Sequence, residues 1–570
     1  MVGKIAISVV SVLLVVGIIV GVVVMVNSNG DSDSKQPHRM PSMKMVTSIC
    51  ELTNYKQACA GSLESVAKND TASANDYILA VVVATLNEVK KSSEATSKVV
   101  VDKAIDELNH VAIQDCKDFF DYAVDKLEDS ISLVSGSNMQ NLEERAHELL
   151  SWMTAVYAFH TTCLDQIQNP DYKSAIQNGT LNSTQLSHNA VNIVAELPQI
   201  LKLFNYHPTL EQNITAEAVA SAATSHHHRR RLMSDGYPTW FGPAERKLLA
   251  RPRAIVPNAV VAKDGSGRFK SISAAIAACP DNNKGRFIIY VKAGIYQEQV
   301  IIKKKKTNIF IYGDGIGRTI VTGRRNFGIM KIGTMHTATF ANEAAGFIAR
   351  GITFSNEAGP QGHQAVAFRS VGDKAAMFDC SFEGHQDTLY YQFLRQFYRN
   401  CRIYGTIDFI FGKGDAVIQD SEIVVRRPLP KQFNTVTADG REIPRGSNGL
   451  VIHNCRIIPD KFLYPIRFQV PTYLGRPWTR EALTVVMQSE LGDFIRPEGW
   501  KLWDGSQNHR SCEMYEFGNR GPGARTDRRN KEFARFKVIG PNQAAKYTPG
   551  LFLAAGQWLP QTGVPFRLGF

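Results

Sequence analysis

The chain has 570 residues, of which 44% are hydrophobic and 21% are charged, an ordinary globular composition. This length allows two or more domains, each with a core of its own. The formal net charge of +12 favours an acidic partner, such as an acidic polysaccharide, an anionic lipid or a nucleic acid. Because the basic residues are widely spread and no nucleic-acid motif stands out, nucleic acid is the weakest of the three.

Residues 1–26 have the pattern of a membrane-targeting segment. Lys4 is followed by the uncharged stretch 5–26, which exceeds the usual apolar core of a signal peptide and suffices for a transmembrane helix. Since no clear small-residue cleavage site follows, we predict a signal-anchor, with a cleavable signal peptide as the alternative. Either interpretation sends the chain into the secretory pathway, and the first tethers the precursor to a membrane.

Sequons and cysteines agree with secretion. There are nine cysteines, some of which should pair in an oxidising compartment, and the odd number leaves at least one thiol free or paired with another chain. Asn-x-Ser/Thr glycosylation sequons occur at Asn69, Asn178, Asn182 and Asn213.

Residues 27–45 are a polar linker, and an all-helical domain is predicted over 46–205. Its apolar residues recur at helical spacing and glycine is scarce, which is typical of a helix bundle. Within this domain Cys50 and Cys59 could close a short loop, and Cys116 and Cys163 could join two helices. The apolar spacing is clearest at Tyr77, Ile78, Val81, Val82 and Leu86.

Residues 206–254 form a basic junction between two unlike regions. Arg231 ends a His-rich and Arg-rich run, and Arg246 with Lys247 forms a second basic site. A flexible basic linker would explain both runs. In a secretory protein we favour proteolytic processing at these sites, for which a subtilisin-like protease is the expected partner.

From residue 255 to 570 the sequence predicts short strands separated by Gly, Asn and Asp turns. One helix is expected near 271–278, and no long helix after it. A parallel β-helix explains a repeat of about 22 residues, whereas the alternative, a β-sandwich, does not. The expected strands include 287–291, 309–312, 348–354, 375–378, 416–418 and 449–452, and the expected inward stack is Phe354, Phe378, Phe382, Ile403 and Phe409.

A polar ladder lies on this repeat. Gln364, Gln386 and Asp408 are spaced 22 residues apart, and Asp387 follows Gln386 directly. On successive coils such positions stack about 4.8 Å apart, which would gather two amides and two carboxylates in one patch. This set suits acyl or glycosyl transfer, although polar residues also recur on the solvated face of a solenoid.

The local motifs resemble those of plant pectin methylesterases. They are Gly-His-Gln at 362–364, Gly-His-Gln-Asp-Thr-Leu-Tyr at 384–390, Gly-Thr-Ile-Asp-Phe-Ile-Phe-Gly at 405–412 and Leu-Gly-Arg-Pro-Trp at 474–478. The resemblance covers about 255–570 and implies a right-handed parallel β-helix. The helical part is similar to the pectin methylesterase inhibitor pro-region, a four-helix bundle whose two disulfides fit the four cysteines named above.

The resemblance also implies roles for individual residues. Asp408 would be the nucleophile, Asp387 the proton donor and later the base, and Gln364 and Gln386 the oxyanion donors. Close carboxylates push their pKa values apart, and a guanidinium keeps one of them charged. No cofactor and no metal is implied, and the implied substrate contacts are Thr334, Gln364, Arg476 beside Asp408, Trp478, Tyr390 and Phe411.

Three departures from the family pattern stand out. Ser421 replaces a cysteine, so Cys401 is left free or pairs with Cys380. His385 stands where many members have tyrosine, and a titration near pH 6.5 would alter the pH profile. Met335 replaces an aromatic residue after Thr334, which puts substrate preference in doubt.

The expected function is removal of methyl esters from cell-wall homogalacturonan, with the helical domain inhibiting the enzyme until it is processed. A pectin-binding wall protein without turnover is the alternative, motivated by the altered loop 324–335. A polysaccharide lyase is a third reading, since β-helices also carry that chemistry. The lysine run 303–306 is expected to be a solvated turn, with a polyanion-binding patch as its alternative.

Overall fold

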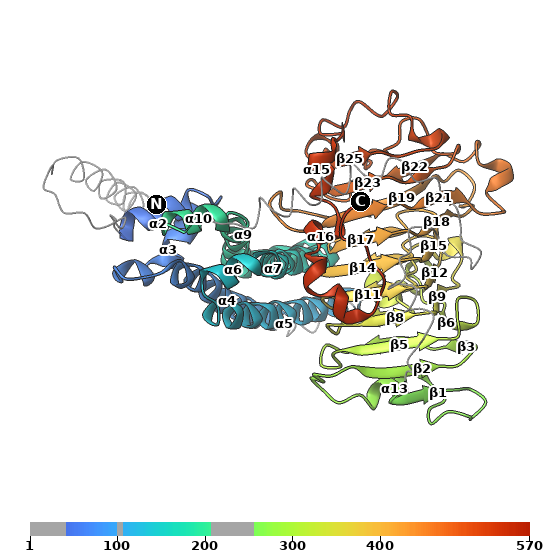
Figure 1. Ribbon diagram of the computed structural model, residues 1–570, viewed down its shortest axis with the longest axis horizontal. Coiled ribbons are helices and arrows are strands. Elements are labelled where there is room, and N and C mark those ends of the chain that lie inside the picture. The colour runs from blue at the N-terminus through green and yellow to red at the C-terminus, as the bar shows by residue number, and fades with distance from the viewer. Residues whose placement is uncertain (1–41, 100–106, 207–255) are drawn as a thin grey trace, which may run out of the picture. The chain divides into compact units, whose positions relative to one another are not determined.

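The computed structural model describes residues 42–99, 107–206 and 256–570 (Figure 1). Among these residues no helix is long and apolar enough to cross a membrane. The predicted membrane segment, Asn213, Arg231, Arg246 and Lys247 lie outside the described residues. The sequon residues Asn69, Asn178 and Asn182 are exposed, as glycosylation requires.

The N-terminal region is helical, as predicted. The four longest helices, α4, α5, α7 and α9, pack against one another as a bundle, and their apolar residues, among them Tyr77, Ile78 and Val81, are buried between them. The helices are α2 (Ser42–Cys50), α3 (Lys56–Leu63), α4 (Ala74–Val99), α5 (Glu107–Ser135), α6 (Met139–Glu144), α7 (Ala146–Gln166), α8 (Pro170–Gly179), α9 (Leu181–Ala195) and α10 (Leu197–Leu203).

Both predicted disulfides are confirmed. Cys50 in α2 bonds Cys59 in α3, and Cys116 in α5 bonds Cys163 in α7. The second bond ties two bundle helices beside the segment of α7 that reaches the functional site. Cys380 and Cys401 are free and buried, so the pairing of these two, one of two predicted alternatives, is wrong.

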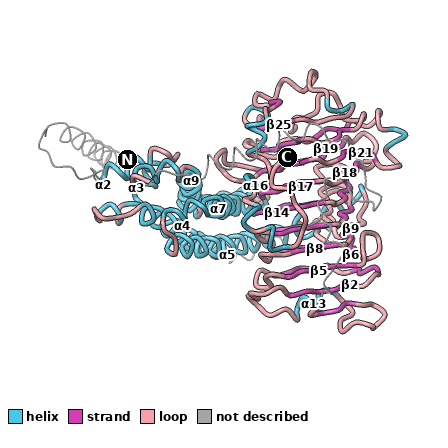
Figure 2. Tube along the Cα trace, viewed as in Figure 1, coloured by secondary structure: helices cyan, strands magenta, loops and turns pink. Residues whose placement is uncertain are grey.

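The C-terminal region is a parallel β-helix, in which three sheets run along the stack (Figures 1 and 2). Every pairing between its strands is parallel, which rules out the β-sandwich. The first sheet contains β1 (Ala259–Val261), β2 (Phe287–Val291), β5 (Ile309–Gly313), β8 (Ile348–Arg350), β11 (Ala375–Phe378), β14 (Arg395–Arg399), β17 (Asp415–Gln419), β20 (Gly449–His453), β23 (Leu483–Met487), β25 (Glu513–Phe517) and β26 (Lys537–Val538).

The other two sheets complete each coil. The second contains β4 (Val300–Ile302), β7 (Phe340–Asn342), β10 (Phe368–Ser370), β13 (Leu389–Tyr391), β16 (Ile410–Gly412), β19 (Asn434–Asp439) and β22 (Thr472–Gly475). The third contains β3 (Gly294–Gln297), β6 (Thr319–Gly323), β9 (Thr353–Asn356), β12 (Ser381–Glu383), β15 (Arg402–Gly405), β18 (Glu422–Val425), β21 (Arg456–Pro459) and β24 (Glu490–Leu491).

The short helices of this region agree with the prediction. The expected helix near 271–278 is α13 (Ile272–Ala277), where the Ser271 side chain accepts a hydrogen bond from the Ala274 N–H. This is the usual N-cap arrangement. After it the only α-helices of the described chain are short, namely α14 (Phe327–Met330), α15 (Pro541–Ala545) and α16 (Pro549–Phe552).

An aromatic and aliphatic stack fills the β-helix. Phe354, Phe382, Ile403 and Phe409 are fully buried inside it, and the rings of Phe354 and Phe382 stack at 5.6 Å. The prediction for Phe378 is wrong. Alternate residues of a strand face opposite sides, and in β11 Phe378 lies on the outer side, in an apolar cluster covered by the C-terminal segment.

Candidate active site

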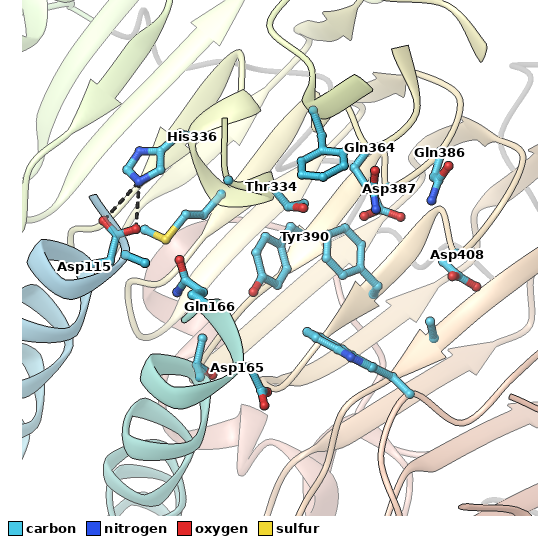
Figure 3. Close-up of a pocket in the computed structure, with 18 of the residues that line it drawn as sticks. Asp115, Asp165, Gln166, Thr334, His336, Gln364, Gln386, Asp387, Tyr390 and Asp408 are labelled. Atoms are coloured by element: carbon cyan, nitrogen blue, oxygen red, sulfur yellow. Dashed lines mark hydrogen bonds and ion pairs between the residues drawn. The ribbon is translucent and has the colours of Figure 1, made fainter. Parts of the chain in front are cut away.

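The polar ladder lines one cavity of about 360 Å³. Gln364, Asp387 and Asp408 precede strands β10, β13 and β16 of the second sheet, and Gln386 forms a parallel bridge with Gln364. Neighbouring coils therefore place the two amides and two carboxylates together, as the spacing predicted. Figure 3 shows the four side chains along the same wall of the pocket.

Both carboxylates stand on left-handed backbone. Asp387 has φ 61° and Asp408 has φ 50°, a conformation that costs a non-glycine residue on the order of 1–2 kcal/mol. The Asp387 N–H donates to the Ile407 carbonyl at 3.1 Å, and the Asp408 N–H donates to Thr435 Oγ1 at 2.9 Å. These bonds fix the two turns, so the carboxylates are held in the cavity wall.

Arg476 clamps the Asp408 carboxylate. Its Nε lies 2.9 Å from Oδ1 and its Nη2 lies 2.5 Å from Oδ2, which is a bidentate pair. Thr435 Oγ1 donates to Oδ1 at 2.6 Å, and the guanidinium stacks on Trp503 with its Cζ 4.2 Å from the ring centroid. Because arginine is not deprotonated in proteins, this arrangement holds a fixed positive charge against the Asp408 carboxylate.

Asp387 has the opposite environment. Burial raises its pKa well above the usual value, the negative charge of Asp408 raises it further, and Arg476 opposes both effects. Within the described part of the chain no hydrogen bond to its carboxyl group is found. A buried carboxyl without a cation of its own keeps its proton while its neighbour is charged.

The two amides are free to donate. In the described structure neither the Gln364 nor the Gln386 side chain has a hydrogen-bond partner in the protein, although both border the cavity. An amide NH₂ group offers two donors. Two such groups beside a carboxylate nucleophile can stabilise an oxyanion that forms during acyl transfer.

Aromatic residues line the cavity beside the polar ladder. The Tyr390 and Phe411 rings stack at 4.2 Å, and Phe411 lies 6.1 Å from Trp478. All three line the cavity, together with Thr334 and Met335. Sugar rings pack well on such surfaces because their C–H faces are apolar.

Comparison with known proteins agrees with this site. Residues 258–557 match the Pectinesterase family, and residues 44–193 match the family described as Plant invertase/pectin methylesterase inhibitor. Pectinesterase 4 of Arabidopsis thaliana is 41% identical over 600 residues and covers all of both chains. The chain belongs to the pectinesterase family.

Two further relatives agree with the assignment to the pectinesterases. A probable pectinesterase/pectinesterase inhibitor of Brassica napus is 39% identical over 590 residues, again with all of both chains covered. The solved pectin methylesterase from carrot is 44% identical with a TM-score of 0.55, and it covers 56% of this chain and 100% of its own. The carrot protein therefore corresponds to about half of this chain.

The helical part of this pectinesterase contributes residues that the sequence did not predict. Asp115 from α5, with Asp165 and Gln166 from α7, borders the same cavity (Figure 3). The His336 Nε2 atom lies 2.8 Å from Asp115 Oδ2. No local pattern marks these residues, because only the packing of α5 and α7 against the β-helix brings them to the site.

Two further expectations, for His385 and for the lysine run 303–306, are resolved by the surroundings of these residues. His385 lines a separate hollow with Tyr404 and Arg426, and burial followed by the Arg426 charge lowers its pKa to about 4. Titration near pH 6.5 is therefore wrong for this histidine. In the lysine run, Lys304 pairs with Asp125 of α5 at 2.7 Å, and Lys303 and Lys306 also have carboxylate partners.

Proposed function

We propose that this pectinesterase hydrolyses the methyl esters of homogalacturonan, releasing methanol and leaving pectate in the plant cell wall. The observation that carries the proposal is the unequal carboxylate pair. Asp408 is held by Arg476, whereas Asp387 is buried without a cation of its own. The net charge of +12 would help retain the protein on its acidic product.

In the first step a carboxylate oxygen of Asp408 attacks the C6 carbonyl carbon of an esterified galacturonate. The carbonyl electrons move onto oxygen, where the Gln364 and Gln386 amides would donate to the oxyanion. When the oxyanion collapses, the bond to the methoxy oxygen breaks and Asp387 donates its proton, so methanol leaves. Asp408 is then joined to the sugar as an acyl-enzyme.

In the second step Asp387, now ionised, takes a proton from water, and the hydroxide attacks the same carbonyl carbon. Cleavage of the acyl bond returns the Asp408 carboxylate and leaves a free galacturonate carboxyl group, which ionises. The proton stays on Asp387, so both carboxyl groups regain their starting states. One ester and one water are consumed in each cycle.

Replacing Gln386 with alanine is expected to lower kcat by roughly 10²–10³, the usual cost of losing one oxyanion donor. KM should change much less, because the oxyanion exists only in the transition state. Methanol release under saturating pectin measures this effect. The matched control is Gln561→Ala, because Gln561 is exposed and does not border the cavity. A change in KM with kcat unchanged would contradict the assigned role.

We further propose that the helical part blocks the cleft until the chain is cut between residues 207 and 255. Phe393 of the β-helix packs against Phe119 and Phe159, with ring centroids 5.7 and 4.6 Å away. Around this apolar centre Arg395, which is fully buried, donates to Glu148 at 3.0 Å. Trp152 Nε1 donates to Asp373 Oδ2 at 3.0 Å.

The test compares the intact chain with one cut at a protease site introduced between residues 207 and 255. A covalent tether keeps the helical part at an effective concentration on the order of millimolar. Cutting and diluting should therefore raise methanol release per enzyme at least about tenfold, and only the cut protein should gain on dilution. Folded cut protein without any release would contradict the esterase function, and equal release by both forms would contradict the blocking role.

The secretory route, the membrane tether and the processing protease are part of the same proposal. They are supported by the apolar stretch 5–26, by the basic residues Arg231, Arg246 and Lys247, and by three exposed sequon asparagines. N-terminal sequencing of the protein extracted from its wall measures the outcome. A mature start near residue 234 or 250 is expected, and a start before residue 46 would contradict processing.

A further inference from the structure

Lys413 holds a buried charge at the edge of the cleft. It directly follows β16, and its side chain is only 1% exposed. Its Nζ lies 2.8 Å from Glu442 Oε1, 2.9 Å from Asp165 Oδ2 and 3.5 Å from Thr161 Oγ1. An ammonium group has three donors, so the three contacts account for all of them.

Two of these three contacts come from the helical part. Asp165 and Thr161 belong to α7, whereas Glu442 belongs to the β-helix. When α7 leaves, Glu442 still holds the charge in place, and two N–H groups lose their partners. Its two open donors can then bind another oxygen ligand in the position that Asp165 vacates.

Lys413 lies next to the aromatic residues that line the cavity. The Lys413 ammonium lies 5.2 Å from the centroid of the Trp478 ring, and Trp478 and Asp165 both line the cavity that contains Asp408. Arg476, the guanidinium of this cavity, is already committed to Asp408. Its positive charge is therefore already balanced within the protein.

We propose that Lys413 is a specificity-determining residue, which binds the free carboxylate of an already de-esterified galacturonate beside the ester under attack, and that Asp165 occupies this carboxylate position in the uncut chain. The inference rests on the proposed esterase function. It names a carboxylate ligand because the group that now fills the position is itself a carboxylate, and a methyl ester carries no charge to pair with the ammonium.

This assignment has a consequence for the pattern of products. Each turnover converts an ester into a carboxylate, which is the ligand that Lys413 recognises. An ester next to an earlier product is therefore preferred over an isolated one. De-esterification should proceed in contiguous runs along the polymer rather than at random positions.

The experiment uses the cut and diluted full chain with two galacturonate oligosaccharides, one fully methyl-esterified and one with alternating free carboxylates. The variant is Lys413→Met combined with Glu442→Gln, which leaves no unpaired buried charge. A charge-assisted hydrogen bond corresponds to about tenfold to a hundredfold. The variant should lose this factor in kcat/KM on the half-esterified oligosaccharide and change less than about threefold on the fully esterified one.

Two controls accompany this variant. Lys461→Met removes an exposed lysine that does not border the cavity and should leave both values unchanged. Lys413→Arg keeps the charge and should keep the preference. Equal losses on both oligosaccharides, or no loss on the half-esterified one, would overturn the assignment of Lys413.

A binding measurement separates this inference from the proposed function. Fully de-esterified oligogalacturonate should bind the cut protein about tenfold to a hundredfold more weakly after the Lys413 change, as read by calorimetry without turnover. Weakened binding with no methanol release by the parent protein would contradict the esterase function but support the Lys413 site. Unchanged binding would overturn the site itself.

If the double variant does not fold, Asp165→Asn in the intact chain tests the same contact from the other side. Loss of the carboxylate should raise methanol release by the uncut protein about tenfold. The matched control is Asp129→Asn, because Asp129 pairs with Lys126 of its own helix. Equal release by the Asp165 variant and the parent would overturn the idea that Asp165 holds the carboxylate position.

Discussion

Replacing Asp408 with alanine is expected to lower methanol release from methyl-esterified pectin by a factor on the order of 10⁴ or more, as for other nucleophiles. The attacking oxygen is lost, and the remaining polar groups can only orient water. Asp408→Asn should be as inactive, because an amide oxygen is a poor nucleophile. It also keeps the hydrogen bond to Thr435, so loss of folding can be separated from loss of chemistry.

The measurement is made on the cut chain, with the melting temperature of each variant recorded beside its rate. Asp527→Ala is the matched control, because Asp527 is an exposed aspartate that pairs with Arg525. Its rate should equal that of the parent. An Asp408 variant that retains more than a tenth of the activity while folded would refute the nucleophile assignment.

The two carboxyl groups differ through their partners rather than through burial. Asp387 is 8% exposed and Asp408 is 6% exposed, so desolvation alone would treat them alike. Arg476 and Thr435 contact only Asp408. The clamp thus divides the roles, because it supports the charge of one group, and that charge then raises the pKa of the other.

Most of the β-helix was predictable because its short strands are strongly apolar. The expected strands 287–291 and 375–378 coincide with β2 and β11. The run 348–354 is divided into β8 and β9, because the chain turns at Gly351, where φ is 64°. Phe378 was misplaced because β11 is buried on both faces, so its hydrophobicity does not reveal which face points inward.

The 22-residue spacing of the polar ladder predicted that its residues lie close together. This prediction works only on the coils that keep the short repeat. Phe368 pairs with Leu389, and Leu389 pairs with Ile410, whereas Ile410 pairs with Thr437 after a longer loop. Arg476 lies beyond such loops, so no period in the sequence could place it beside Asp408. The resemblance to pectin methylesterases suggested it instead.

The rest of the site was not predictable from local sequence. Trp503 reaches Arg476 from a loop without a motif, and Asp115 and Asp165 reach the cleft from a different domain. Their positions depend on how two folded parts pack against each other. The family resemblance indicated that the helical part inhibits the enzyme, yet it did not indicate which of its side chains enter the cavity.

Replacing Asp387 with asparagine is expected to lower kcat/KM by roughly 10²–10⁴, the range for a general acid and base. The amide cannot protonate the leaving methoxy oxygen or take a proton from water. The parent needs Asp387 protonated and Asp408 ionised, and the raised pKa of Asp387 keeps its proton above the usual carboxyl range. Parent activity should therefore fall as pH rises through that pKa, and the residual activity of the variant should lack this alkaline limb.

The same substitution should raise the thermal stability of the protein while it lowers the activity. A catalytic role can therefore be told apart from a structural one. A carboxyl group whose pKa is raised by folding stabilises the protein fully below its unfolded pKa and loses this contribution as pH rises through the folded pKa. At neutral pH the parent holds a buried carboxyl group whose ionisation is disfavoured by folding, and the variant lacks this group. Asp387→Asn should therefore melt at a higher temperature while it loses activity. A variant that is both inactive and less stable would indicate a structural role, and one that keeps the alkaline limb would assign that limb to another group.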